Sequence, residues 1–225
     1  MANPEVNSTM PAQIYNMGRQ RRGKQLLALA VFVLLCLGVL SLVAHFTATR
    51  IARNEQAWFA AQINALIPVA QHDNDLLADK IWVHAPEALG TRKAVAVFRA
   101  RLQGKPTALI INSVAPDGYG GPIELLVAVN YAGEVLGVHV VAHHETPGMG
   151  DEFALPGSHW LDAFRGHSVS NPELRGWNVR KDGGEFEQFT SATISPRAII
   201  QAVHRTLDYY QQHREQLFQE ASASD

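Results

Sequence analysis

The chain contains 225 residues, carries a net charge of −2 and is 47% hydrophobic. This near-neutral charge argues against a nucleic-acid-binding protein, which would display a strongly basic surface. Cys36 is the only cysteine, so the chain can form neither an intrachain disulfide nor a metal cluster held by cysteines of its own. A chain of this length can form one domain with its own core in addition to a terminal segment.

The N-terminal region has the pattern of a membrane anchor. Residues 1–25 form a polar arm that ends in a basic cluster of Arg19, Arg21, Arg22 and Lys24. Residues 26–46 contain no Asp, Glu, Lys or Arg and are numerous enough for a helix to cross a bilayer. A cleaved signal peptide is the alternative, but its apolar core usually has only about 7–15 residues and a small-x-small cleavage site should follow. Because the heavier Lys/Arg load precedes the apolar run, we expect a single-pass protein of a bacterial inner membrane, with a cytoplasmic N-terminus and a periplasmic domain.

The next segment, residues 47–90, is predicted to be a helical linker into this domain. Its apolar residues recur at helical spacing, and Pro68 ends the pattern. These residues are Trp58, Phe59, Ile63, Leu66 and Ile67.

Alternating apolar residues then predict a run of strands at residues 94–101, 107–114, 123–130 and 134–142. Two turns, at residues 104–106 and 132–133, separate neighbouring strands and favour antiparallel pairs. A glycine-rich loop, PDGYGGP, occupies residues 116–122. A short helix is expected over 156–164, a long closing helix over 196–219 and a polar tail at 220–225. The sequence therefore predicts an α+β domain over residues 91–219, with a largely antiparallel sheet flanked by helices.

Residues 143–151, HHETPGMGD, form the first stretch with chemical interest. The simplest interpretation is a loop between a strand and a helix, marked by Pro147, Gly148 and Gly150. His139 and His143 would lie about 13 Å apart on a regular strand, so they cannot ligate one metal ion, and we expect no metal site. A serine hydrolase is also disfavoured, because no serine near the histidines lies in a Gly-x-Ser-x-Gly elbow.

The second such stretch is residues 187–193, EQFTSAT, followed by a helix start at Ser195-Pro196. Thr193 is predicted to lie just before the helix N-terminus, where free N–H groups and the helix dipole favour an anion such as a phosphate. An ordinary helix cap is the simpler interpretation of this spacing.

These two stretches together resemble the FMN-binding domain family. Residues 187–193 resemble its flavinylation motif, Asp-x-x-Ser/Thr-Gly-Ala-Ser/Thr, with Glu187 in place of Asp and Ser191 in place of Gly. Residues 145–150 resemble its Glu-Thr-Pro-Gly-Leu-Gly signature, with Met149 in place of Leu. The order of the basic arm, the apolar run and the motifs is similar to the G subunits of Rnf electron-transport complexes. It is more distantly similar to the C subunits of sodium-pumping NADH:quinone reductases.

The resemblance implies a site and a function. A flavin transferase would recognise Glu187 and attach FMN covalently, through a phosphoester, to Thr193. Further cofactor-binding residues would be Thr190, Ser191, Ala192, Glu145, Thr146, Gly148 and Gly150. Trp177 would either stack near the flavin or belong to the core. The partners would be the membrane, the transferase and the other membrane subunits of a ferredoxin- and NAD-linked ion-translocating complex. In that complex the chain would relay electrons without being catalytic alone.

Two alternatives remain open at this stage. A regulatory or sensor module could use the same flavin domain, although such proteins usually carry more membrane helices or iron–sulfur cysteines. A structural subunit with a decayed flavin site is suggested only by Glu187 and Ser191. Flavin content and co-purifying membrane partners distinguish the three functions.

Overall fold

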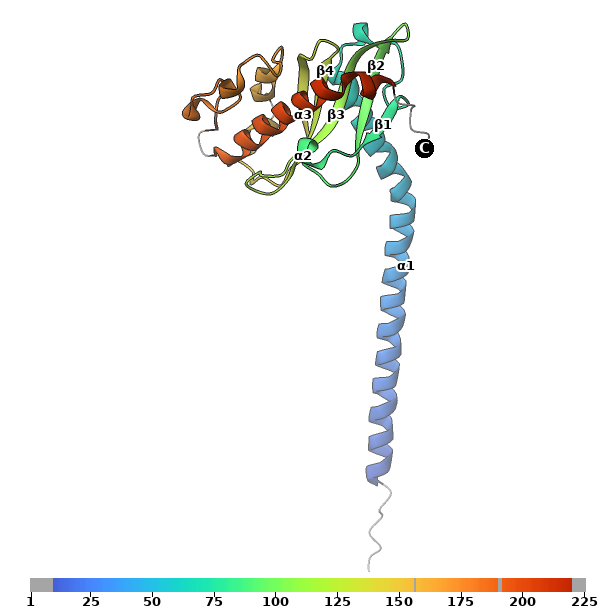
Figure 1. The fold of residues 1–225 in the computed structure, drawn as a ribbon. Helices are drawn as coiled ribbons and strands as arrows, with labels where there is room; N and C mark the ends of the chain where they lie inside the picture. The colour runs from blue at the N-terminus through green and yellow to red at the C-terminus, as the bar shows by residue number, and fades with distance from the viewer. Residues whose placement is uncertain (1–9, 156, 190–191, 220–225) are drawn as a thin grey trace, which may run out of the picture. The chain divides into compact units, whose positions relative to one another are not determined.

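The computed structural model describes residues 10–155, 157–189 and 192–219 of the chain (Figure 1). The chain divides into two compact units between Ala57 and Trp58. Helix α1 (Met10–Leu66) forms the described part of the first unit and continues into the second.

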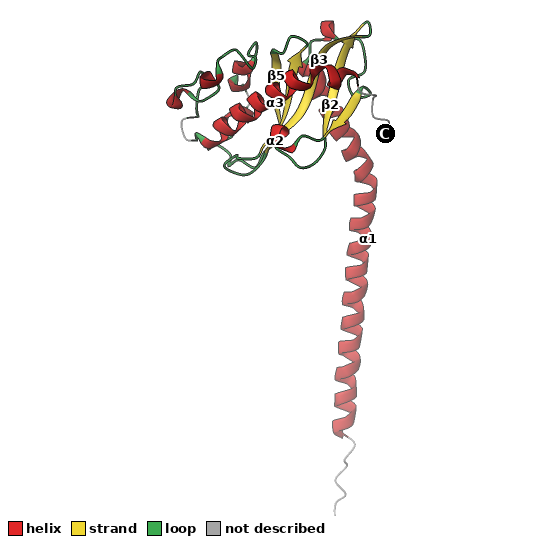
Figure 2. Cartoon of the chain, viewed as in Figure 1, coloured by secondary structure: helices red, strands yellow, loops and turns green. Residues whose placement is uncertain are grey.

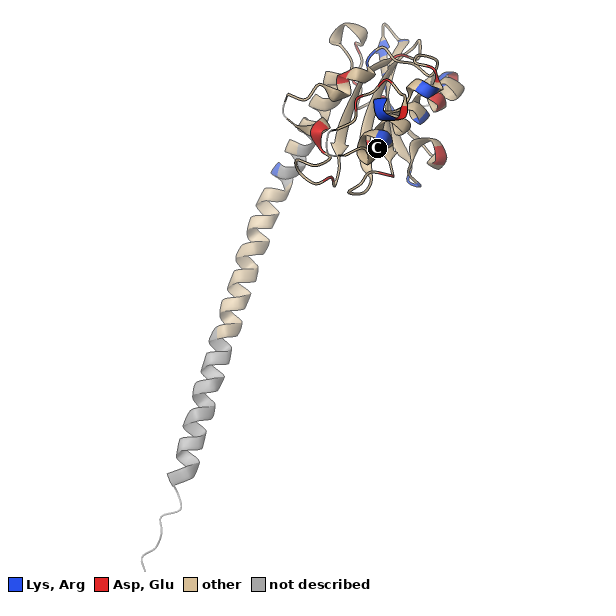
Figure 3. Cartoon of the chain, turned by 90° about the vertical axis from the view of Figure 1, so that its left-hand side faces the viewer, with Lys and Arg blue, Asp and Glu red and all other residues tan. Residues whose placement is uncertain are grey.

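The first unit contains a segment suited to a bilayer. Leu29–Ala48 is a 20-residue stretch of α1 with a mean hydropathy of 2.6, and Figure 3 shows this stretch without acidic or basic residues. Its length in a helix matches the apolar thickness of a membrane. It overlaps most of the apolar run at residues 26–46, so one N-terminal apolar helix fits a membrane anchor.

The second unit is built on one five-stranded sheet (Figure 2). The strands are β1 (Lys80–Val83), β2 (Val95–Leu102), β3 (Lys105–Ala115), β4 (Ile123–Asn130) and β5 (Val135–Ala142). They pair in sequence order and every pair is antiparallel. Gln103 and Gly104 both have positive φ between β2 and β3, as a two-residue hairpin turn requires. The predicted α+β fold with an antiparallel sheet is confirmed.

Both faces of the sheet are covered, which explains why its central strands are apolar at nearly every position. Alternate residues of β3 and β4 point to opposite sides. Leu109, Ile111 and Val127 pack with helix α3 (Ile194–Gln219), which Figure 1 shows lying across the sheet. Ile110 and Leu126 pack on the other side, against the last turns of α1 and the segment that follows.

Segment 47–90 contains more than the end of α1. It also includes β1 and the short helix α2 (Pro86–Leu89), so the sheet begins before residue 91. The remaining elements are 3₁₀ helices: η1 (Val69–Gln71), η2 (Glu152–Ala154), η3 (Trp160–Phe164), η4 (Leu174–Gly176) and η5 (Arg180–Asp182). The helix expected over residues 156–164 is thus a 3₁₀ turn that starts at Trp160.

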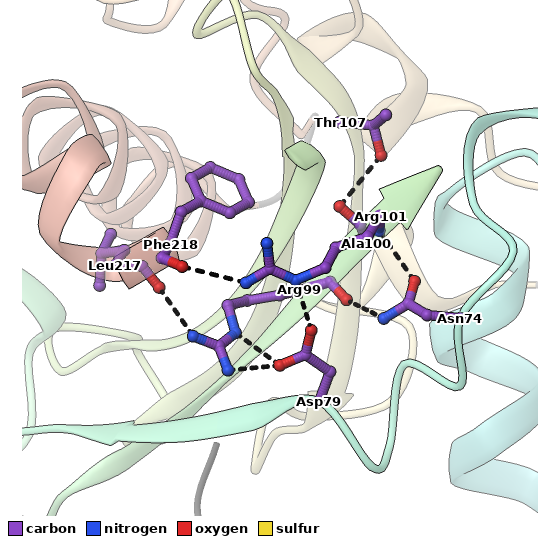
Figure 4. Close-up of polar contacts among 8 residues, drawn as sticks. All are labelled: Asn74, Asp79, Arg99, Ala100, Arg101, Thr107, Leu217 and Phe218. Carbon is purple, nitrogen blue, oxygen red and sulfur yellow. Dashed lines mark hydrogen bonds and ion pairs between the residues drawn. The ribbon is translucent and has the colours of Figure 1, made fainter. Parts of the chain in front are cut away.

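A partly buried ionic network fixes the C-terminal end of α3 to the sheet (Figure 4). Asp79 accepts hydrogen bonds from Arg99 Nε and Arg101 Nε, each at 2.7 Å. The same two guanidinium groups donate to the carbonyls of Leu217 and Phe218, at 3.5 and 3.0 Å. Terminal carbonyls of a helix lack intrahelical donors and carry the negative end of its dipole, so two arginines stabilise them.

Candidate functional site

Three segments far apart in the sequence meet around the side chain of Glu145. They are the glycine loop at 116–122 between β3 and β4, the loop at 143–150 after β5, and the first turn of α3. Glu145 is only 5% exposed, and its Oε1 accepts a hydrogen bond of 3.2 Å from the N–H of Gly120. The N–H of Tyr119 donates to Ser195 Oγ at 3.4 Å. These two bonds join the glycine loop to both of the other segments.

Two glycines allow this close approach. A Cβ on Gly120 would lie 2.1 Å from the carbonyl oxygen of His144, a distance that no side chain tolerates. A Cβ on Gly150 would lie 3.0 Å from Glu145 Oε2 and 3.7 Å from Ser195 Oγ. The segments therefore approach so closely that only glycine fits at these positions without a shift of its neighbours.

The carboxylate of Glu145 is incompletely satisfied. Its Oε2 is buried and has no hydrogen-bond partner among the residues that the structure describes. A buried acceptor without a donor is costly, by about 1–3 kcal/mol. The site thus offers a buried acceptor to a ligand that brings its own N–H or O–H group.

Thr193 lies directly before α3, which begins at Ile194. The N–H of Arg197 donates to the carbonyl of Thr193 at 3.4 Å, so Thr193 opens the first helical turn. Thr193 and Ala192 are partly exposed. Ser195, predicted to cap the helix from outside, is instead buried inside the first turn, because the helix starts earlier than its proline indicates. Thr190 and Ser191 fall outside the described residues.

A groove of about 800 Å³ passes beside both motifs. The loop at 143–150 contributes Gly148, and the flavinylation-like stretch contributes Glu187, Gln188 and Phe189. The facing wall comes from a segment in which the sequence shows no motif, including Leu155, Ser158 and Trp160. A volume of this size lies within the range of small-molecule sites.

Hydrogen bonds and ion pairs order the walls of this groove. The indole N–H of Trp160 donates to the carbonyl of Glu187 at 2.7 Å. The carboxylate of Glu187 pairs with Arg180. Asp151, which was not among the predicted site residues, accepts a hydrogen bond of 2.7 Å from the N–H of Gly148 and is 8% exposed. The only feature of the sequence that could have indicated Asp151 is its position directly after the Pro-Gly-Met-Gly run.

The remaining candidates divide between surface and interior. Thr146 and Gly148 are exposed, and Gly150 is buried beside Glu145. Trp177 is fully buried and packs against Phe164 and Phe186, so it belongs to the core.

Two histidines that suggested metal ligands contact aromatic rings. The ring of His139 lies against Trp58 and that of His143 against Phe153, at 6.2 and 5.1 Å between centroids.

One further charged pair lies near the start of α3. Arg197 Nε donates to Asp182 Oδ2 at 2.5 Å. This hydrogen bond lowers the pKa of Asp182 and raises that of Arg197, so both groups stay charged at neutral pH. The pair ties the turn at η5 to the helix that follows Thr193.

Comparison with known proteins assigns the class. A family described as the FMN-binding domain matches residues 118–208, a range that includes the loop at 143–150, the first turn of α3 and residues 118–122 of the glycine loop. The fold and the site thus define an FMN-binding domain.

Full-length relatives identify the family more closely. The chain is 43% identical over 192 residues to the G subunit of the ion-translocating oxidoreductase complex from Shewanella oneidensis, an alignment that covers 85% of this chain and 91% of the relative. The corresponding subunits from Pseudomonas aeruginosa and Vibrio cholerae are 43% and 44% identical over 191 residues, covering 85% of this chain and 89% and 91% of theirs. The chain belongs to this family, the G subunits of ion-translocating oxidoreductase complexes. The predicted family resemblance is confirmed.

The described residues fit FMN. The ribityl hydroxyls of FMN are donors that would suit the buried Oε2 of Glu145, which lacks one among the described residues. Gly148 has open space where a Cβ would stand, so a ligand can approach its backbone, and the groove that it lines is large enough for a flat ring. Residue 193, at the N-terminus of α3, is suited to a phosphate.

Proposed function

We propose that this chain is a membrane-anchored flavoprotein subunit that carries FMN on Thr193 through a phosphoester. In this function it relays electrons within a ferredoxin- and NAD-linked, ion-translocating complex. The observation that carries the proposal is the position of Thr193. It directly precedes α3, and Ala192 and Ser195, which flank it, lie close to Gly150 beside the buried, incompletely satisfied Glu145.

The chain's own residues would hold the cofactor in three places. The phosphoester at Thr193 benefits from the positive end of the α3 dipole. Glu145 accepts a donor of the ribityl chain. Gly148 and Thr146, both exposed at the loop, would contact the flavin ring. When bound, FMN supplies a ring that takes up and releases one or two electrons, while the protein provides orientation and shielding from water.

The position of the groove supports placing the isoalloxazine ring of FMN in it. Phe189 lines the groove, and Thr193 follows it by four residues, which span at most about 14 Å. A cofactor tethered at Thr193 therefore starts close to the groove. Glu187, which also lines the groove, serves in this proposal as the acidic residue that the flavin transferase recognises.

The membrane arrangement is part of the same proposal. The stretch Leu29–Ala48 crosses the bilayer, the basic arm at 1–25 stays in the cytoplasm and the FMN domain lies in the periplasm. The partners are the transferase and the other membrane subunits, and the names of the relatives support the latter. A covalent tether prevents loss of the cofactor in a compartment that lacks a flavin pool.

Flavin fluorescence in a denaturing gel tests the attachment site. The full chain is expressed with a flavin transferase, as wild type and as Thr193→Ala, Thr193→Ser and Thr91→Ala. Thr91 is a partly buried loop threonine beside a different groove, so it is the matched control. We expect fluorescent bands for wild type, Thr193→Ser and Thr91→Ala and a dark band for Thr193→Ala. A fluorescent Thr193→Ala band of wild-type intensity would refute attachment at Thr193.

A second measurement tests the electron-relay role. Affinity purification of the full chain from its own membranes should recover other membrane subunits that carry redox centres. Recovery of a flavin-loaded chain with no such subunits would instead favour a regulatory module.

A further inference from the structure

Trp160 is the most strongly oriented aromatic side chain in the groove. It opens η3 and is partly exposed, and its indole N–H is fixed to the carbonyl of Glu187 at 2.7 Å. Its ring meets Phe164 edge-on, at 5.4 Å between centroids and 81°. It also meets Phe189 edge-on, at 5.1 Å and 64°. These three contacts hold the indole in one orientation before any ligand arrives.

The other aromatic groups nearby are less suited to meet a ligand. Phe189 lines the groove but is only 2% exposed, because its ring packs on Phe153 and Trp160. Trp177, which the sequence analysis considered as a flavin contact, is 0% exposed and does not line the groove. Trp160 is thus the partly exposed indole in the described groove, where a ligand can reach it.

We propose that Trp160 is a positioning residue for the flavin, and that the isoalloxazine ring lies against its indole face. This inference rests on the proposed attachment of FMN at Thr193. The chemistry of the two rings supports it, since an electron-poor flavin ring and an electron-rich indole attract each other in offset-stacked or edge-to-face pairs. The hydrogen bond to the backbone of Glu187 also links this wall to the motif that carries the attachment site.

The link has a structural consequence. Glu187 stands six residues before Thr193, so the same short segment positions the indole at one end and the flavin tether at the other. The orientation of the ring is thereby set by the protein in advance and does not depend on the flexible ribityl chain alone.

Flavin emission provides a direct test. An excited flavin in contact with an indole accepts an electron from it and returns the electron as the pair relaxes, which quenches the fluorescence without net oxidation. A phenylalanine does not quench in this way. We compare wild type with Trp160→Phe and with the control Trp82→Phe, whose ring is 56% exposed on strand β1 and does not line the groove. Each native emission is divided by the emission of the same sample after denaturation, which corrects for the amount of covalent flavin.

The expected result is a low ratio for wild type and Trp82→Phe and a several-fold higher ratio for Trp160→Phe. An unchanged ratio in Trp160→Phe, with equal flavin in the denatured samples, overturns the role of Trp160. A wild-type chain without covalent flavin contradicts the proposed function itself, so the two failures are distinct.

A second measurement covers the case in which Trp160→Phe folds or loads poorly. The chain has four tryptophans, so full-length protein labelled with 5-fluorotryptophan gives four fluorine signals. These signals are assigned in unloaded protein with single Trp→Phe variants. Loaded wild type is then compared with Thr193→Ala, which retains Trp160. A shift of the Trp160 signal larger than those of Trp58 and Trp82 supports the proposal, and an unshifted Trp160 signal refutes it.

Discussion

Replacing Gly120 with alanine tests whether the loops meet as described. The new Cβ would lie 2.1 Å from the oxygen and 2.5 Å from the carbon of the His144 carbonyl, so the backbone of one loop must move. Overpacking of this kind costs about 1–3 kcal/mol. The movement also removes the N–H donor from the buried carboxylate of Glu145, which costs about another 1–3 kcal/mol. We therefore expect Gly120→Ala to lower the free energy of unfolding by about 2–6 kcal/mol.

Urea unfolding in detergent, followed by tryptophan emission, measures this loss. Asp117→Ala is the control, because Asp117 is an exposed residue of the same loop and such changes usually stay within about 0.5 kcal/mol. The Gly120→Ala variant should also accept less flavin than the control, since the distorted loop adjoins the first turn of α3. A Gly120→Ala protein that unfolds within about 1 kcal/mol of wild type would refute the described contact between the loops.

Two further predictions concern stability. Asp79→Ala removes a carboxylate that faces the 2%-exposed side chain of Arg99, and should cost about 3–5 kcal/mol in urea unfolding, whereas Asp162→Ala at an exposed ion pair should cost less than about 1 kcal/mol. Equal losses in the two variants would contradict the network in Figure 4. Burial lowers the pKa of His204, so the unfolded chain binds a proton at this residue more readily than the folded chain does. The free energy of unfolding should therefore fall as the pH drops below about 6.5. His204→Gln should decline less steeply between pH 7 and pH 5 than the exposed control His159→Gln, and parallel profiles would contradict this linkage.

The long, regular elements of the fold were predictable from the sequence. Strands β2 to β5 each span eight or more residues, and glycine marks the turns between them, so their limits were predicted to within about two residues. Strand β1 was not predicted, because four residues are too few for a period to be visible. Ile81 and Val83 point inward only because β2 lies beside them.

The candidate site was predictable in its motifs but not in its assembly. The loop at 143–150 and the stretch at 187–193 carry recognisable residues. The glycine loop at 116–122 was visible only as a turn, since its contact with Glu145 depends on the pairing of β3 with β4. Trp160 carried no signal either, because its role depends on a hydrogen bond to a backbone carbonyl 27 residues away. Composition could not distinguish it from Trp177, and only burial separates the two.

Mass spectrometry of the peptide that contains Thr193 tests the central claim most directly. The protein is purified from its own membranes, digested and sequenced by fragmentation. We predict a peptide whose mass is increased by one FMN less one water, with the modification on Thr193. An unmodified Thr193, with flavin absent or attached at another residue, would contradict the proposed attachment and the function built on it.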